Sequence, residues 1–152
     1  MQKFITNSNK QTQKLGEMLA QELRGNEVIC LSGDLGAGKT TFTQGLLKGL
    51  KIKGPYTSPT FVILKKYKLQ PTKCNLQNVY HIDAYRIKDK DLLALGWKEM
   101  IADKSNIIIV EWAERVKKII PASAVWIKFK WTDENKREIG FNFWIFNFVI
   151  FK

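Results

Sequence analysis

The chain has 152 residues, which suits one domain with a buried core, and its hydrophobic content of 45% argues against a disordered protein. The N-terminus turns polar after Ile5, and the longest apolar stretch, FNFWIFNFVIF, is far shorter than the roughly 20 residues of a membrane-spanning helix. The net charge of +11 favours an anionic partner such as nucleic acid, but only four of the 25 basic residues are Arg, so lysines scattered over a solvated surface explain it equally well. We therefore expect a cytoplasmic protein that makes no contact with a membrane.

The first predicted element is an amphipathic helix over residues 10–24, in which apolar side chains recur on one stripe. The apolar run EVICLSG, residues 27–33, predicts a buried strand. Because Cys30 lies within it, we expect two reduced thiols rather than a disulfide with Cys74. Helical spacing returns over residues 40–50, so a strand and then a helix are expected on either side of a glycine-rich segment.

Residues 53–61 contain two prolines and a glycine and predict a loop. Residues 61–69 and 78–87 predict two strands with a short connection between them. Residues 89–103 follow a helical pattern, although Gly96 interrupts it.

The strongest strand pattern is NIIIVE, residues 106–111, which has four consecutive β-branched residues. A short helix is expected after it and before Pro121. Residues 124–131 and 137–151 then predict an antiparallel pair joined by the polar turn TDENK. Together these elements predict an α/β fold in a single domain over residues 1–152, with a mixed, mainly parallel central sheet flanked by helices and an antiparallel C-terminal strand pair.

The segment GDLGAGKT, residues 33–40, matches the phosphate-binding pattern G-x-x-x-x-G-K-[ST] at every fixed position, between a predicted strand and a predicted helix. In such a P-loop, successive backbone N–H groups wrap a phosphate at a helix N-terminus. Lys39 is expected to reach the β- and γ-phosphates, and the Thr40 hydroxyl to ligate Mg²⁺. The residues expected to bind the nucleotide along this segment are Asp34, Leu35, Gly36, Ala37, Gly38, Lys39, Thr40 and Thr41.

Two carboxylates follow predicted strands at the edge of the sheet where a P-loop fold binds its ligand. NIIIVE runs into Glu111, and VYHID runs into Asp83. Either acid is placed to reach Mg²⁺ directly or through water, or to orient an attacking water, and either is also placed to cap a neighbouring helix. The two acids and the P-loop together predict nucleotide hydrolysis.

The roles of other polar and aromatic residues near these motifs can be interpreted in more than one way. Thr60 lies on the proline-stiffened loop after the P-loop helix, where a switch-type protein senses the γ-phosphate. His81, the sole histidine, is expected to have a structural role within its strand. Arg86 and Arg115 each follow an acid, which fits ion pairing or stabilisation of transition-state charge. Trp112 either stacks on a base or fills the core.

The order GDLGAGKTTF, SPTF, YHIDAYR and VEWAER resembles the TsaE family, small P-loop ATPases of bacterial tRNA threonylcarbamoyladenosine synthesis that are also known as YjeE proteins. The similarity runs from the first predicted helix to about Pro121, and it implies an α/β P-loop domain that binds ATP and Mg²⁺. The resemblance implies these residue roles: phosphate and Mg²⁺ binding for Lys39 and Thr40, a second metal ligand for Glu111, a switch-like loop for Thr60, a catalytic or metal-associated acid for Asp83, and a place near the nucleotide for Trp112.

The resemblance also implies two protein partners, TsaD and TsaB. TsaD transfers the threonylcarbamoyl group to the adenosine beside the anticodon of ANN-decoding tRNAs, and TsaE proteins support that reaction through an ATP cycle. Contact with tRNA is then indirect, through the complex, and direct contact is a separate hypothesis that the charge of +11 motivates. The aromatic C-terminal third matches the family poorly.

Three alternative functions remain open from the sequence. A small-molecule or nucleotide kinase shares the P-loop logic, but kinases commonly close Arg-rich lids, and the arginines here are not clustered. A GTPase-like switch is disfavoured because neither NKQT nor NKRE supplies the Asp of N-K-x-D. A module that binds ATP without hydrolysing it is the third.

Overall fold

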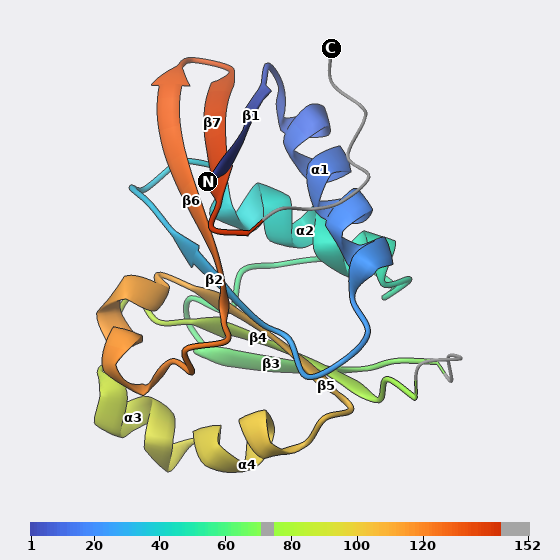
Figure 1. The fold of residues 1–152 in the computed structure, drawn as a ribbon, viewed down its shortest axis with the longest axis vertical. Coiled ribbons are helices and arrows are strands. Elements are labelled where there is room, and N and C mark those ends of the chain that lie inside the picture. The colour runs from blue at the N-terminus through green and yellow to red at the C-terminus, as the bar shows by residue number, and fades with distance from the viewer. Residues whose placement is uncertain (71–74, 144–152) are drawn as a thin grey trace.

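A computed structural model describes residues 1–70 and 75–143 of the chain (Figure 1). The helices and strands in these ranges are, in chain order, β1 (Gln2–Thr6), α1 (Asn9–Glu22), β2 (Val28–Ser32), α2 (Lys39–Gly49), β3 (Leu64–Lys68), β4 (Asn78–Asp83), α3 (Asp89–Ala94), α4 (Trp97–Ala102), β5 (Asn106–Glu111), the 3₁₀ helix η1 (Ala113–Ile119), β6 (Val125–Asp133) and β7 (Lys136–Phe141). None of the helices in this part of the chain combines the length and the apolar composition needed to cross a bilayer.

The strands of the described ranges form one seven-stranded sheet in the order β1-β7-β6-β2-β5-β4-β3. The central neighbours β6, β2, β5 and β4 run parallel. At the edges, β3 pairs antiparallel with β4, and β7 pairs antiparallel with both β6 and β1. This arrangement confirms the predicted α/β fold with a mixed sheet, a parallel centre and an antiparallel C-terminal pair.

Helices cover both faces of the sheet, as Figure 1 shows. Ile29 and Leu31 of β2 pack in one hydrophobic cluster with side chains of α1 and α2. Val28 and Cys30, which alternate with them, pack on the opposite face in a second cluster with side chains of α3, α4 and η1. Because β2 and β5 are buried on both faces, their sequences are continuous apolar runs rather than alternating ones.

Several predicted elements differ from the structure at their bounds, and three of the differences have a local cause. Gly96 has a φ of +88°, a left-handed conformation that divides the helix predicted over residues 89–103 into α3 and α4. The strand predicted over residues 78–87 ends at Asp83, where the chain turns. The strand predicted over residues 61–69 starts only at Leu64, since the preceding residues belong to the loop.

The sequence patterns do not predict β1, which forms an edge of the sheet. Its five residues contain only two apolar side chains, and one of them, Ile5, is exposed while Phe4 is buried. A segment this short carries too little alternation to indicate a strand. The strand predicted over residues 137–151 is confirmed as far as Phe141. Residues 142 and 143 do not continue it, and residues 144–151 of the prediction lie outside the described part of the chain.

Candidate functional site

The glycine-rich segment forms a loop between β2 and α2, as the sequence predicts. Gly33 leaves the strand with a φ of +134°, and a Cβ at this position would lie 2.3 Å from the carbonyl oxygen of Phe129 on β6. Only glycine therefore lets the chain turn out of β2 this close to the neighbouring strand. Gly38, with a φ of +103°, then caps α2 without a side chain, which leaves the first N–H groups of the helix at the loop.

Lys39 begins α2 and folds back over the loop. Its Nζ donates hydrogen bonds to the carbonyl oxygens of Gly33, at 2.5 Å, and of Asp34, at 2.8 Å. The same ammonium lies 3.7 Å from the centroid of the Trp112 ring, a cation–π contact. Burial lowers the pKa of Lys39, and the nearby carboxylates of Glu114, Glu111, Asp34 and Asp83 act in the opposite direction.

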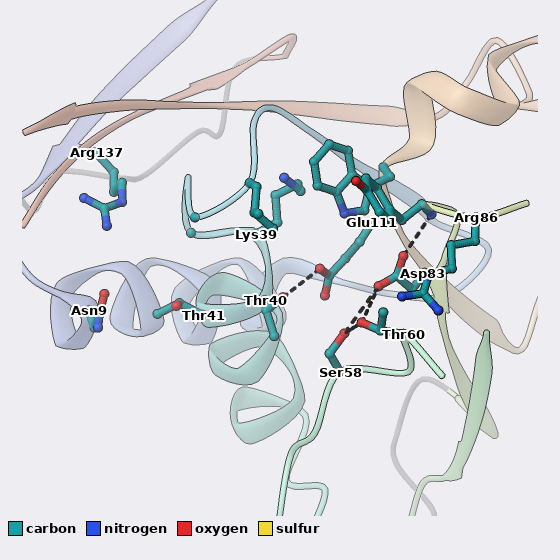
Figure 2. Close-up of a pocket in the computed structure, with 15 residues that line it drawn as sticks. Asn9, Lys39, Thr40, Thr41, Ser58, Thr60, Asp83, Arg86, Glu111 and Arg137 are labelled. Atoms are coloured by element: carbon teal, nitrogen blue, oxygen red, sulfur yellow. Dashed lines mark hydrogen bonds between the residues drawn. The ribbon is translucent and has the colours of Figure 1, made fainter. Parts of the chain in front are cut away.

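Glu111, at the end of β5, connects the sheet to α2, the helix that follows the glycine-rich loop (Figure 2). The Thr40 hydroxyl donates to Glu111 Oε2 at 2.8 Å. The other carboxylate oxygen, Oε1, lies 2.8 Å from Nε2 of His81, and both of these side chains are 2% exposed. A buried carboxylate of this kind is tolerated because both of its oxygens have hydrogen-bond partners.

Asp83, at the end of β4, anchors the loop that carries Thr60. The Thr60 hydroxyl donates to Asp83 Oδ2 at 2.8 Å, and Ser58 lies 2.7 Å from Thr60 and 3.4 Å from the same carboxylate oxygen. The backbone N–H of Tyr85 donates to Oδ1 at 2.9 Å. Asp83 pairs in register with Glu111 on the adjacent parallel strand, so the two acids lie side by side but hold different segments.

These groups surround one cleft of about 310 Å³. The predicted residues that line the cleft are Leu35, Gly36, Gly38, Lys39, Thr40, Thr41, Thr60, Asp83, Glu111 and Trp112. Asp34 and Ala37 belong to the loop but do not line the cleft. Ala37 is fully buried, and Asp34 contributes its carbonyl group to Lys39.

The donor set in the cleft fits Mg²⁺ that is bound together with phosphate. Within residues 1–70 and 75–143, no three His, Cys, Asp or Glu side chains gather into a metal site of their own. Mg²⁺ characteristically takes one or two protein oxygens and completes its shell with substrate phosphates and water. The Thr40 hydroxyl and the Glu111 carboxylate, 2.8 Å apart beside the loop, supply two such oxygens.

The sequence model of the family "Threonylcarbamoyl adenosine biosynthesis protein TsaE" matches residues 6–139. The chain belongs to the TsaE family. The tRNA threonylcarbamoyladenosine biosynthesis protein TsaE of Aquifex aeolicus is 41% identical over 141 residues, which cover 91% of this chain and 94% of that protein. The protein of the same name in Bacillus subtilis is 34% identical over 139 residues, covering 91% and 84%.

A solved structure supports the same relationship. The crystal structure of YdiB from Bacillus subtilis superposes with a TM-score of 0.74 at 32% identity, covering 92% of this chain and 83% of that one. The resemblance to TsaE proteins that the sequence motifs indicate is thereby confirmed over most of the chain, and so is the α/β architecture.

Several residues of this TsaE-family cleft carry no signal in the sequence. Figure 2 shows Asn9 and Arg137 on the side of Thr41, away from Asp83 and Arg86. Asn9 comes from the start of α1 and Arg137 from β7, so the sheet order brings them to the glycine-rich loop.

Tyr85 and Trp112 pack against each other on one side of the cleft, a contact that the sequence patterns do not predict. The rings of Tyr85 and Trp112 lie 4.8 Å apart, and the Arg115 guanidinium lies 4.8 Å from the Tyr85 ring. Trp112 has a φ of +59°, which turns the chain out of β5 beside Lys39. Arg86 lines the cleft on the side of Asp83, whereas Arg115 does not line it.

Proposed function

We propose that the chain is a Mg²⁺-dependent ATPase subunit of tRNA threonylcarbamoyladenosine synthesis, acting in the cytoplasm with TsaD and TsaB. The modified base is the adenosine next to the anticodon in tRNAs that decode ANN codons. One observation carries the proposal: the hydrogen bond from Thr40 to Glu111 joins a P-loop helix to a strand-end carboxylate in the same cleft. Membership of the TsaE family supports the pathway.

ATP is held by the loop and the start of α2. The backbone of residues 34–38 and the N-terminal end of α2 favour an anionic phosphate. Lys39 supplies the positive charge for the β- and γ-phosphates, and Thr41 lies next on the helix to contact the α-phosphate. The Trp112 ring flanks the lysine ammonium.

Thr40 and Glu111 hold the metal in this scheme. Held there, Mg²⁺ would neutralise charge on the phosphate oxygens during hydrolysis. Asp83 ends β4 beside Glu111, and its carboxylate is hydrogen-bonded to Thr60. Hydrolysis calls for a carboxylate that accepts a proton from water and a hydroxyl that contacts the γ-phosphate, and we give these roles to Asp83 and Thr60. Asp83 orients the attacking water, and Thr60 reports whether the γ-phosphate is present.

The partners complete the cycle. The loop that carries Thr60 also carries Phe61, whose side chain is 87% exposed, beside the exposed Val62. Contiguous apolar surface that stays exposed marks sites of protein interaction, and these two neighbouring side chains favour such a site here. We therefore assign TsaD–TsaB to this side of the molecule, with tRNA contacted through the complex.

The test is ATP hydrolysis by the purified protein, with and without TsaD–TsaB from the same source. We expect slow hydrolysis alone and stimulation by the pair. Glu111→Ala should abolish the stimulated rate and spare ATP binding measured without metal. A rate that stays flat on addition of TsaD–TsaB refutes the assignment of partners.

Product analysis in the same assay separates hydrolysis from phosphoryl transfer. A kinase transfers the γ-phosphate to a metabolite, so rapid ATP-dependent phosphorylation in a screen of acceptors would replace the ATPase assignment. Competition between ATP and GTP tests the nucleotide, and a clear preference for GTP contradicts the proposal. Nucleotide binding without turnover in the complete complex leaves only a binding module.

A further inference from the structure

His81 is the sole histidine of the chain and lies in the interior of β4. It precedes Asp83 by two residues, so both side chains point to the same face of the sheet, the face that α1 and α2 cover. Its Nε2 lies 2.8 Å from Glu111 Oε1, and both side chains are almost completely removed from solvent.

The surroundings of the ring assign its tautomer. An ionised Glu111 carboxylate only accepts hydrogen bonds, so Nε2 must carry the proton of this contact. Nδ1 is buried and has no hydrogen-bond partner among residues 1–70 and 75–143. A proton on Nδ1 would be a buried donor without an acceptor in this region, which is costly, so the geometry favours the Nε2–H tautomer.

The two oxygens of Glu111 are divided between two partners. Oε1 accepts from His81, and Oε2 accepts from Thr40. Without the first contact, the carboxylate is free to rotate about its terminal torsion, which has only a broad preference. The hydrogen bond from the ring therefore fixes the plane of the carboxylate and directs Oε2 towards the P-loop helix.

We infer that His81 is a positioning residue that holds the Glu111 carboxylate for the divalent cation through its Nε2–H group. This inference rests on the proposed function, in which Glu111 and Thr40 bind Mg²⁺. Hydrogen bonds that orient a metal-binding carboxylate are commonly worth about 10–100-fold in metal affinity. A side chain that merely fills the space beneath Glu111 has no such effect.

The test compares two substitutions of the histidine by the affinity for Mn²⁺ in the presence of ATP, measured by electron paramagnetic resonance. His81→Leu removes the donor, and we expect the affinity to fall by about 10–100-fold. His81→Gln keeps an N–H donor at a similar distance from the backbone and should recover most of that loss. Asn106→Ala is the matched control. Asn106 is also buried and begins β5, and its substitution removes the hydrogen bond that it donates to the Met100 carbonyl and the one that it accepts from Asn78, at the end of the strand opposite Glu111.

The outcomes separate the inference from the proposed function. Unchanged Mn²⁺ affinity in His81→Leu overturns the inference, and so do equal losses in the Leu and Gln variants. Glu111→Ala is measured in parallel. If it leaves the affinity unchanged, the metal ligand itself is misassigned and the proposed function fails first.

A second measurement needs no substitution. Because the chain has one histidine, its side-chain nitrogen resonances are unambiguous in a ¹⁵N-labelled sample. We expect the Nε2–H tautomer with an unprotonated Nδ1 in the folded wild-type protein. A spectrum of the Nδ1–H tautomer overturns the inference even if the His81→Leu variant does not fold.

Discussion

Replacing Gly33 by alanine should destabilise the protein far more than replacing Gly36, although both glycines belong to the same loop. Both have positive φ values, +134° and +76°. A Cβ at Gly33 meets the carbonyl oxygen of Phe129 at 2.3 Å, whereas a Cβ at Gly36 meets no atom of the described residues within 4 Å. Both positions thus require a positive φ, and only Gly33 adds a collision with backbone.

The difference can be given a magnitude. A left-handed conformation costs an alanine about 1–2 kcal/mol, which is the expected loss for Gly36→Ala. At Gly33 the obstacle is backbone of β6, the strand that pairs directly with β2, and it cannot move without disturbing that pairing. Overpacking of this kind adds about 1–3 kcal/mol, so Gly33→Ala should lose about 2–5 kcal/mol.

Urea unfolding measures the difference. With a denaturant slope of about 1–3 kcal/mol per molar, the unfolding midpoint of Gly33→Ala should lie about 1 M below that of Gly36→Ala. The five tryptophans provide the fluorescence signal. Equal midpoints at equal slopes refute the reasoning, because they mean that the carbonyl of Phe129 does not limit this turn.

The remaining predictions concern single groups of the cleft and the core. Burial lowers the pKa of Lys39, so the unfolded state binds more protons between the lowered pKa and the ordinary value of 10.5. The unfolding free energy of the wild type should therefore rise with pH through that window relative to that of Lys39→Met. Without nucleotide at neutral pH, the Lys39→Met variant should be at least as stable as the wild type. A Lys39→Met variant that is less stable than the wild type at every pH contradicts this. Burial raises the pKa of the Cys30 thiol to about 12, so at pH 8 iodoacetamide should modify Cys30 only as fast as the protein unfolds, and prompt modification of the Cys30 peptide in native protein contradicts the burial. Thr60→Val removes a hydrogen bond to the Asp83 carboxylate, worth about 1.5–3 kcal/mol, and turnover should fall about tenfold or more with ATP affinity little changed; loss of affinity alone argues against a switch role. Filter binding with tRNA tests the separate hypothesis of direct contact: if the chain alone binds tRNA through phosphates, its affinity should drop steeply between about 50 and about 200 mM salt, and binding that does not change with salt excludes phosphate contacts.

Much of the site could be predicted because its signals are local. The glycine-rich loop is a continuous segment, and its strand and helix flanks follow from adjacent apolar patterns. Glu111 and Asp83 end buried strands, and the parallel pairing of β4 with β5 brings them together at one edge of the sheet. The geometry of a parallel sheet predicts that the two carboxylates lie close together, but it does not determine which segment each of them contacts.

The other contacts depend on pairing between distant parts of the chain. His81 lies in an ordinary strand pattern, and only the register of β4 against β5 places its ring below Glu111. Arg137 reaches the cleft because β7 folds back on β6, and Asn9 because β1 joins the outer side of β7. Long-range pairings of this kind have no periodicity to indicate them, so the sequence provides no basis for predicting these residues.

The short loop before β3 carries one side chain that is hydrogen-bonded in the cleft and two apolar side chains that are exposed. The side chain of Thr60 is tied to Asp83, while Phe61 and Val62 next to it face solvent. A protein that packs on these apolar side chains therefore acts on the same few residues that close one side of the cleft. By thermodynamic reciprocity, the factor by which such a protein tightens nucleotide binding must equal the factor by which nucleotide tightens its own binding. The four equilibrium constants form a closed cycle, so any three of them determine the fourth.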